Sequence, residues 1–391
     1  MLGEIAEITS GGTPSRTKPK YWGGTIPWVK TTLIQNGVIE ESEVDEWITE
    51  EGLNKSSAKM IPEGTILMAM YGQGKTRGQV AILNFKATVN QACAAIHLNE
   101  GANRDFVFQQ LLFRYISIRG LSNTGSQENL SIGLIKEIPL LLPELNTQKS
   151  IAHLLSAWDF AILKTTRLIE AKESRLEWYR AQFLTGKKRL PGFNDKWKSQ
   201  RLSEVLIEHG EPCVGTEEVY SVSVHQGLIN QIEHLGRSYA AANTAHYNLV
   251  KPGDIVYTKS PTGDFPLGII KQSKIKKNVI VSPLYGVFSP KSPYLGILLD
   301  CYFESPSNTI NYLRPVVQKG AKNTISVTNS GFLSNSLSLP TSIEEQKALG
   351  NFVELAKMEI GILKQQAAAY RKQKRGLMQK LLTGEWRINI K

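Results

Sequence analysis

The sequence contains few residues of the kinds that build disulfide frameworks and metal centres. Among its 391 residues are only three cysteines, Cys93, Cys213 and Cys301, which lie far apart and form no CxxC or Cys/His cluster. An odd number of isolated cysteines is typical of proteins from a reducing compartment. The six histidines have no ligand or triad spacing to one another. We therefore expect a cytoplasmic protein with no zinc site and no other bound metal.

Long apolar runs are also missing, which argues against a membrane protein. No stretch approaches the ~20 apolar residues that cross a bilayer, and the N-terminal MLGEIAEI lacks the basic start and apolar core of a signal peptide. The residues present in excess are basic, because the net charge is +11 and the isoelectric point is about 9.3. This balance favours a polyanionic partner, although many basic proteins have none.

One stretch occurs twice and organises the chain. Residues 143–186 correspond to residues 341–384 without a gap, at a constant offset of 198 positions. Both copies have Gln-Lys near the start, at 148–149 and 346–347, and both end on Leu-Thr-Gly. A repeat of this length indicates two copies of one architectural unit.

Each copy is predicted to form one long helix. Its apolar side chains recur at alternating steps of four and three residues, which is the heptad spacing of a coiled coil. Ser342 and Glu345 fit a capping box at the start of the second helix, and Gly186 and Gly384 fit C′ glycines at the two ends. The side chains expected to pack along the helices are Ile151, Leu155, Trp158, Ile162, Ile169 and Leu176 in the first copy, and Leu349, Val353, Ile360 and Leu377 in the second.

Helices of this size would be unusual in the core of an ordinary domain. Roughly 40 residues form a rod about 60 Å long, whereas the mean helix of a globular protein has about a dozen residues. The alternative of two separate core helices therefore accounts for the length less well. Two rods with matching apolar seams most simply pack on each other.

The blocks that precede the two repeats, 1–142 and 190–340, are predicted to be mixed α+β domains. Residues 61–83 have the pattern of strand, glycine-rich loop and strand, and residues 250–270 repeat it. The apolar residues within 105–121 recur with the spacing of a helix. Elsewhere the loops of the two blocks differ, as expected of two binding modules with different targets on one scaffold. Drift of a purely structural duplication would look similar.

The linker 189–202 joins the first repeat to the second block. No counterpart precedes Leu2, so we expect the natural chain to carry a short additional segment at its N-terminus. The predicted organisation is a domain at 1–142, a long helix at 143–189, a second domain at 190–340 and a second long helix at 341–391.

These features resemble the specificity subunits of type I restriction–modification systems over essentially the whole chain. The resemblance is based on the two helical repeats, on LPGFNDKW at 190–197, and on the Gly…Leu-Ser and Gly…Ile-Ser loops before the helices, at 125–131 and 320–326. It implies an α/β fold of two target recognition domains separated by two long antiparallel helices. Each domain would bind one half of a bipartite DNA site. The helices would set the spacer length and dock two modification subunits.

The resemblance also implies that this chain is not an enzyme and binds no cofactor itself. The modification subunits would use S-adenosylmethionine to methylate adenine, and restriction or motor subunits would use ATP and Mg²⁺ to cleave DNA. The sequence agrees, because it contains no Asn/Asp-Pro-Pro-aromatic methyltransferase motif, no nuclease cluster and no helicase motif set. The expected partners are therefore double-stranded DNA and these subunits, with no membrane.

Basic and amide side chains in the two blocks are the candidate DNA contacts. Lys and Arg suit phosphates or guanine edges, and Asn and Gln can bond bidentately to adenine. Each residue also has a plain alternative as solvated surface charge or as ordinary loop chemistry. The candidates are Arg16, Lys18, Lys20, Lys30, Tyr71, Gln73, Lys75, Arg77, Gln127 and Asn129 in the first block, and Lys259, Arg314, Lys319, Lys322 and Asn323 in the second.

Two other interpretations stay open. Residues 69–76, AMYGQGKT, fit the permissive form of a phosphate-binding loop, which would make the chain a nucleotide-binding enzyme using Gly74-Lys75-Thr76. Such a loop must open a helix, whereas RGQVAI at 77–82 is typical of a strand. The third interpretation is a structural coiled-coil scaffold whose two blocks bind only protein.

Overall fold

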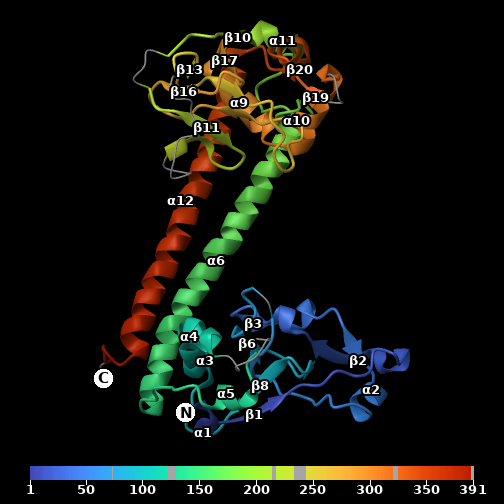
Figure 1. The fold of residues 1–391 in the computed structure, drawn as a ribbon, viewed down its shortest axis with the longest axis vertical. Helices are drawn as coiled ribbons and strands as arrows, with labels where there is room; N and C mark the ends of the chain where they lie inside the picture. The colour runs from blue at the N-terminus through green and yellow to red at the C-terminus, as the bar shows by residue number, and fades with distance from the viewer. Residues whose placement is uncertain (73, 122–128, 214–216, 233–243, 320–324, 389–391) are drawn as a thin grey trace. The chain divides into compact units, whose positions relative to one another are not determined.

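The chain forms two compact units that share its two long helices. The computed structural model describes residues 1–391 except 73, 122–128, 214–216, 233–243, 320–324 and 389–391 (Figure 1). Unit 1 comprises Met1–Thr166 and Gln365–Lys391, and unit 2 comprises Arg167–Lys364. Helices α6 (Leu145–Phe183) and α12 (Ile343–Leu382) therefore contribute one part to each unit. Each unit also contains a module of shorter elements.

Module 1, the module of unit 1, has the mixed α+β architecture predicted for it. Its elements are α1 (Leu2–Ile5), β1 (Ala6–Ser10), η1 (Pro19–Tyr21), β2 (Trp22–Val29), η2 (Thr31–Leu33), β3 (Val38–Ile39), η3 (Glu41–Glu43), β4 (Trp47–Ile48), α2 (Glu50–Asn54), β5 (Ile66–Ala69), β6 (Val80–Leu83), β7 (Thr88–Val89), β8 (Cys93–Leu98), α3 (Arg104–Phe113), α4 (Tyr115–Gly120) and α5 (Ile132–Lys136). The main sheet has the strand order β1-β8-β5-β6-β3, and a second sheet has the order β4-β2-β7.

Strand β5 is buried on both of its faces, which fixes the hairpin that it forms with β6. Successive side chains of a strand point to opposite faces. Ile66 accordingly packs in a core with Leu2 of α1 and Val107 of α3, while Leu67 packs in a separate core with Val29 of β2. The strands on either side of the β5–β6 loop are thus held firmly, and the loop extends from their ends.

Module 2, the module of unit 2, repeats the framework of module 1. Its elements are β9 (Lys198–Arg201), α7 (Leu202–Val205), β10 (Leu206–Glu208), β11 (Tyr220–Ser223), β12 (Gly227–Asn230), β13 (Asn248–Val250), β14 (Ile255–Tyr257), β15 (Ile270–Gln272), β16 (Val279–Val281), β17 (Gly286–Pro290), α9 (Pro293–Phe303), α10 (Pro306–Leu313), η4 (Arg314–Val316), β18 (Gln318–Lys319), β19 (Ile325–Ser326), α11 (Asn329–Ser334) and β20 (Ser336–Leu339). Two-stranded sheets β11-β12, β13-β16, β18-β19 and β20-β9 complete its described part.

The main sheets of the two modules have the same strand order. In module 2 it is β10-β17-β14-β15, with all neighbours antiparallel, and it corresponds to β1-β8-β5-β6 of module 1. In both modules a helical turn precedes the first strand, a hairpin supplies the third and fourth, and a helix follows the second, α3 in module 1 and α9 in module 2. The internal repeat predicted from the sequence is confirmed by this common topology.

The long helices pack antiparallel within each unit. In unit 1, Leu155 from the first half of α6 shares a core with Leu381 from the end of α12. In unit 2, Tyr179 from the last turns of α6 shares a core with Val353 from the first half of α12. Of the expected packing positions, Ile151, Leu155, Ile169, Leu176, Leu349, Val353 and Ile360 are buried, and Trp158, Ile162 and Leu377 are half-buried.

Both long helices end just before the expected glycines. The φ angles of Gly186 and Gly384 are +71° and +76°, a left-handed conformation that favours glycine and stops a helix. The helices have 39 and 40 residues and are therefore clearly shorter than the segments 143–189 and 341–391. In the described parts of the chain, no helix combines the length and apolar character that crossing a membrane requires.

The start of α12 differs from the expected capping box. The Ser342 side chain does accept a hydrogen bond from the backbone N–H of Glu345, at 3.2 Å. The Glu345 carboxylate, however, accepts two hydrogen bonds from the Arg189 guanidinium, at 2.7 and 2.6 Å, instead of bonding back to the cap. The predicted bond from the Glu345 side chain back to the backbone of Ser342 is therefore wrong, because an arginine distant in sequence binds that carboxylate.

Candidate nucleic-acid interface

The Arg16 side chain of module 1 is held against two tryptophans. Its Cζ atom lies 3.7 Å from the ring centroid of Trp22 and 4.9 Å from that of Trp28, and the guanidinium also pairs with Glu46. Lys18, two residues further on, lies 5.2 Å from the centroid of a neighbouring tyrosine ring. Cation–π contacts fix these cations in one orientation, which reduces the entropy lost when they bind an anion.

The other two lysines predicted in this part of module 1 are paired with carboxylates. Lys20 lies 2.6 Å from Glu51, and Lys30 lies 2.7 Å from Asp45. Hydrogen bonds to these carboxylates raise the pKa values of both lysines. The lysines stay charged, but their acidic partners cancel much of their field. They would therefore attract a polyanion less strongly than their number suggests.

The loop between β5 and β6 presents only part of the predicted contact set. Tyr71 is 43% exposed and Lys75 is also exposed. Arg77 is buried, and its Nη2 donates a hydrogen bond to the carbonyl oxygen of Arg119 at 3.0 Å. Arg77 therefore ties the loop to α4. The sequence had instead predicted that its guanidinium would contact a phosphate or a guanine. Gln73 lies outside the described residues.

Helix α4 contributes contacts that the sequence reasoning missed. The Tyr115 hydroxyl donates to the carbonyl oxygen of Lys75 at 2.6 Å and accepts a hydrogen bond from Arg119 Nη1 at 3.1 Å. These bonds fix the backbone that carries Lys75 and place a second cation, Arg119, beside it. The signal available in the sequence was the four-residue spacing of Tyr115 and Arg119, which puts both side chains on one helical face.

Asn129 lies at the base of the same loop. The backbone N–H of Leu130 donates to the carbonyl oxygen of Met70 at 3.0 Å, and this bond brings Asn129 next to Tyr71. The backbones of the half-buried Asn129 and the exposed Tyr71 therefore lie near each other, although the two segments are far apart in the sequence. The predicted contact Gln127 lies outside the described residues.

In module 2, Lys259 occupies the corresponding hairpin loop, between β14 and β15. Its φ of +58° is unusual for lysine, and burial lowers the pKa of its side chain. Gly268 packs closely beneath it, because an added Cβ would lie 2.9 Å from the Lys259 backbone. Arg314 is exposed at the start of η4. Of the other predicted contacts, Lys319 lies in β18, and Lys322 and Asn323 lie outside the described residues.

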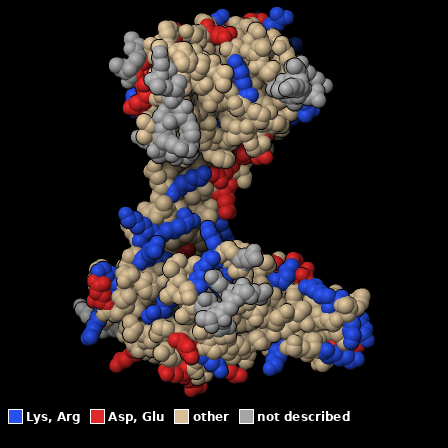
Figure 2. All heavy atoms as spheres, in the orientation of Figure 1, with Lys and Arg blue, Asp and Glu red and all other residues tan. Residues whose placement is uncertain are grey.

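The long helices carry an exposed basic surface in unit 1. Figure 2 shows lysine and arginine side chains gathered over the part of α6 and α12 that adjoins module 1. The exposed basic residues there include Lys164, Arg371, Lys372 and Arg375, and Arg371 Nη2 donates to the Thr166 hydroxyl across the helix pair at 3.2 Å. A polyanion that reached the β5–β6 loop would experience this positive field as well.

The segment 74–83 does not have the geometry of a phosphate-binding loop. Residues 74–78 form turns, and β6 follows at Val80, so no helix begins after Thr76 within this described segment. A phosphate-binding loop needs the helix N-terminus that follows it. This observation contradicts the nucleotide-binding interpretation of Gly74-Lys75-Thr76. Among the described residues, no group of three His, Cys, Asp or Glu side chains is placed to hold a metal ion.

The architecture defines a class of protein: two related mixed α+β modules, each packed on part of a duplicated pair of antiparallel helices. Residues 1–173 match the sequence model of the family described as the type I restriction modification DNA specificity domain. The first part of the chain is thus similar to this domain. The resemblance predicted from the sequence, to type I specificity subunits, is confirmed by this match and by the following similarities.

Two curated relatives are specificity subunits of type I restriction enzymes. The chain is 29% identical over 189 residues to that of EcoR124I/EcoR124II from Escherichia coli, which covers 46% of each chain. It is 27% identical over 233 residues to that of MjaIX from Methanocaldococcus jannaschii, which covers 56% of this chain and 53% of the relative. The chain spans about half the length of these relatives. The solved S subunit of a type I restriction-modification system from M. genitalium shares the fold, with a TM-score of 0.62 and 15% identity over 97% of this chain and 94% of that one.

Proposed function

We propose that the chain is the DNA specificity subunit of a type I restriction–modification complex. The observation that carries this proposal is the duplication of one framework, with the same strand order in both modules and the same helix positions beneath them. A common framework with different loops suits two readers of two different DNA sequences. The target recognition domains would be residues 1–142 and 190–340, each binding one half of a bipartite site.

In module 1, the β5–β6 loop and the segment beside it are the proposed DNA contact. Lys75 would pair with a phosphate, which releases counterions and makes binding sensitive to salt. Asn129 would read an adenine edge through its amide, with the exposed ring of Tyr71 beside it. In module 2, Lys259 would supply a contact at the base of the corresponding hairpin loop, and Arg314 would supply a further phosphate contact.

The long helices would set the spacer and dock the modification subunits. Exposed apolar side chains favour a role as a protein interface, and the helices carry them at matching positions. Phe160 on α6 is 61% exposed, and Met358, which is 198 positions later on α12, is 57% exposed. Leu163 on α6 and Ile362 on α12 are exposed as well. One such surface on each copy of the repeat is consistent with two modification subunits.

Catalysis would belong to the partners, and this chain would be the non-catalytic member of the complex. The modification subunits would bind S-adenosylmethionine and methylate adenine in each half-site. Restriction or motor subunits, where present, would use ATP and Mg²⁺. Because the substrate would be cellular DNA, we place this complex in the cytoplasm.

Mapping methylated bases tests the proposal directly. The chain is combined with its modification subunits, the complex is given S-adenosylmethionine and DNA of diverse sequence, and modified adenines are located by sequencing. The expected result is a bipartite motif with adenine modified in both halves and an unspecified spacer of constant length. A single continuous motif would contradict the two-module assignment. Absence of sequence-selective, salt-sensitive DNA binding by the complex would instead favour the protein-binding scaffold.

A further inference from the structure

Unit 2 joins its module to the helices through a network of charged side chains. Arg180 on α6 and Lys357 on α12 both pair with Glu304, the residue that caps the C-terminus of α9, and the Lys357 distance is 2.7 Å. Lys357 also lies 3.6 Å from the carboxylate of Asp300, which is 2% exposed. Here both helices provide cations, and the module provides the anions.

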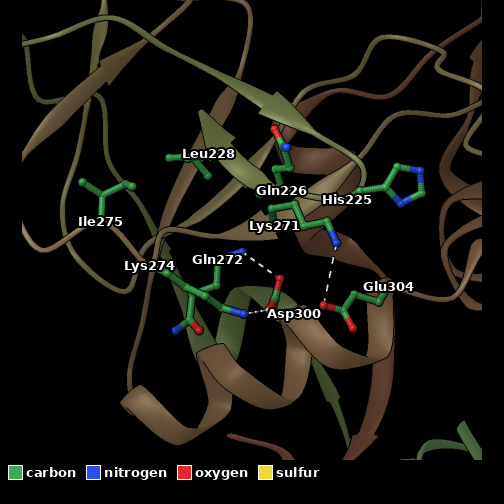
Figure 3. Close-up of a pocket in the computed structure, with 10 residues that line it drawn as sticks. His225, Gln226, Leu228, Lys271, Gln272, Lys274, Ile275, Asp300 and Glu304 are labelled. Atoms are coloured by element: carbon green, nitrogen blue, oxygen red, sulfur yellow. Dashed lines mark hydrogen bonds and ion pairs between the residues drawn. The ribbon is translucent and has the colours of Figure 1, made fainter. Parts of the chain in front are cut away.

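The network continues into a cavity of about 140 Å³ on the module side (Figure 3). Lys274 lies 3.0 Å from Asp300 and Lys271 lies 3.8 Å from Glu304, and the backbone N–H of Gln272 donates to Asp300 at 3.1 Å. Burial alone would raise the pKa of Asp300, but the surrounding lysines hold it below its usual value. The two carboxylates are thus surrounded by cations, so the junction depends on their staying negative.

Unit 1 has the opposite arrangement at its junction. Lys374 of α12 binds both carboxylate oxygens of Asp159 of α6, at 2.6 and 2.8 Å. The module contributes a neutral group, because the Gln109 amide of α3 donates to the same carboxylate at 2.7 Å. Lys374 and Gln109 are buried. Here the helices supply a complete ion pair, and the module supplies only an amide.

The two junctions differ in charge at the same position of the helical repeat. Asp159 and Lys357 are separated by the repeat offset of 198 positions. Their neighbours in the repeat, Leu155 and Val353, both pack in the core that joins helix to module. If module 2 docked at the unit 1 position, Asp300 and Glu304 would meet Asp159 instead of a lysine. Breaking a buried pair leaves an uncompensated charge, which is strongly destabilising.

We propose that positions 159 and 357 form a matching code between each module and its own stretch of helix, so that a module docks stably only where the helix charges complement its own. The apolar cores at the two junctions also differ, because that of unit 2 contains the stacked rings of Tyr179 and Phe352. The charges add to this difference, because a mismatch excludes the wrong module as well as favouring the right one. This inference concerns assembly of the chain and holds whatever the modules bind.

The test moves the junction of unit 2 towards that of unit 1 within the full chain. Lys357→Asp alone should place three carboxylates together and lower the melting temperature by about 5 °C or more. Adding Glu304→Gln should recover at least half of that loss, because Arg180 can then pair with the new carboxylate while Asp300 keeps its ion pair with Lys274. Hydrogen exchange in α9 should rise in the single variant and fall again in the double variant.

The matched control reverses the pair in unit 1. Asp159→Lys combined with Lys374→Asp should leave the melting temperature within about 2 °C, because the Gln109 amide can accept or donate a hydrogen bond. The code is overturned if Lys357→Asp leaves melting and α9 exchange unchanged. It is also overturned if the added Gln gives no recovery, because the loss would then come from packing and not from charge.

Discussion

The two modules share their framework and differ in the surfaces mounted on it. Both have a central sheet with the same strand order and a helix that packs on equivalent positions of the long helices. Module 1 adds the sheet β4-β2-β7, with Arg16 stacked on two tryptophans, whereas module 2 adds short two-stranded sheets. The comparison teaches that the duplicated part preserves docking geometry, while the loops and the junction charges have diverged.

Their hairpin loops make this difference concrete. In module 1 two hydrogen bonds hold the β5–β6 loop: the Tyr115 hydroxyl donates to the Lys75 carbonyl, and Arg77 donates to the Arg119 carbonyl. The exposed side chains of this loop include Tyr71 and Lys75. In module 2 the β14–β15 loop is held by close packing of Gly268 against Lys259. The same topological position therefore carries different chemistry, as two readers of different sequences would require.

The largest expected effect follows from lengthening the scaffold that both modules share. Inserting one heptad after Thr166 in α6 and another after Lys364 in α12 adds about 10 Å to each helix, or about three base pairs of DNA. Methylated motifs should keep both half-sites and gain about three base pairs of spacer. A seven-residue insertion after the exposed Gly192 of the linker is the control and should change neither. An unchanged spacer in the helix variant would rule out the spacer role.

The next effect probes the cores that join helices to modules. Leu155 and Val353 occupy equivalent positions of the repeat and are fully buried. Leu155→Ala should lower the free energy of unfolding by about 3 kcal/mol, and Val353→Ala by about 2 kcal/mol, because fewer carbons are removed. Denaturant unfolding measures both, with exposed Leu163→Ala expected to stay within about 0.5 kcal/mol. Costs as small as that control would mean that the two cores do not anchor the modules.

A smaller effect is expected at the two hairpin loops. Lys75→Ala and Lys259→Ala should each weaken DNA binding by the assembled complex several-fold and reduce the slope of log affinity against log salt by about 0.9, one lysine–phosphate contact each. Their effects should add, because the residues belong to different units. Lys136→Ala, at the end of α5, is the control and should leave the slope unchanged. A loss in only one of the two lysine variants would show that the hairpins are not equivalent.

The smallest effect concerns the starts of the two long helices. Ser342 caps α12 by accepting the backbone N–H of Glu345, so Ser342→Ala should destabilise unit 2 by about 1 kcal/mol. The corresponding residue before α6 is Glu144, and Glu144→Ala should cost no more than about 0.5 kcal/mol. Thermal unfolding compares the two variants. Equal costs would indicate that the Ser342 cap is not used.

Much of the fold was predictable because its signals are local. The seam through Leu155 and Val353 repeats every few residues, and the glycines at 186 and 384 follow the last apolar positions of the two seams, where a left-handed residue ends a helix. The β5–β6 hairpin could likewise be predicted from its turn residues. The candidate site was less predictable: Arg77 looked like Lys75 in the sequence, yet only Lys75 is exposed, since the burial of Arg77 depends on α4.

The sequence by itself determined that the chain has two copies of one scaffold and where its long helices run, because helical periodicity and C′ glycines act within a few residues. Tertiary structure alone decided which charges meet. It pairs Arg189 with Glu345, Lys357 with Glu304, and Lys374 with Asp159. Each of these contacts joins segments far apart in the chain, and its partner depends on how the segments pack. The duplicated helices could therefore be predicted from the sequence, whereas the difference in charge between their two junctions could not.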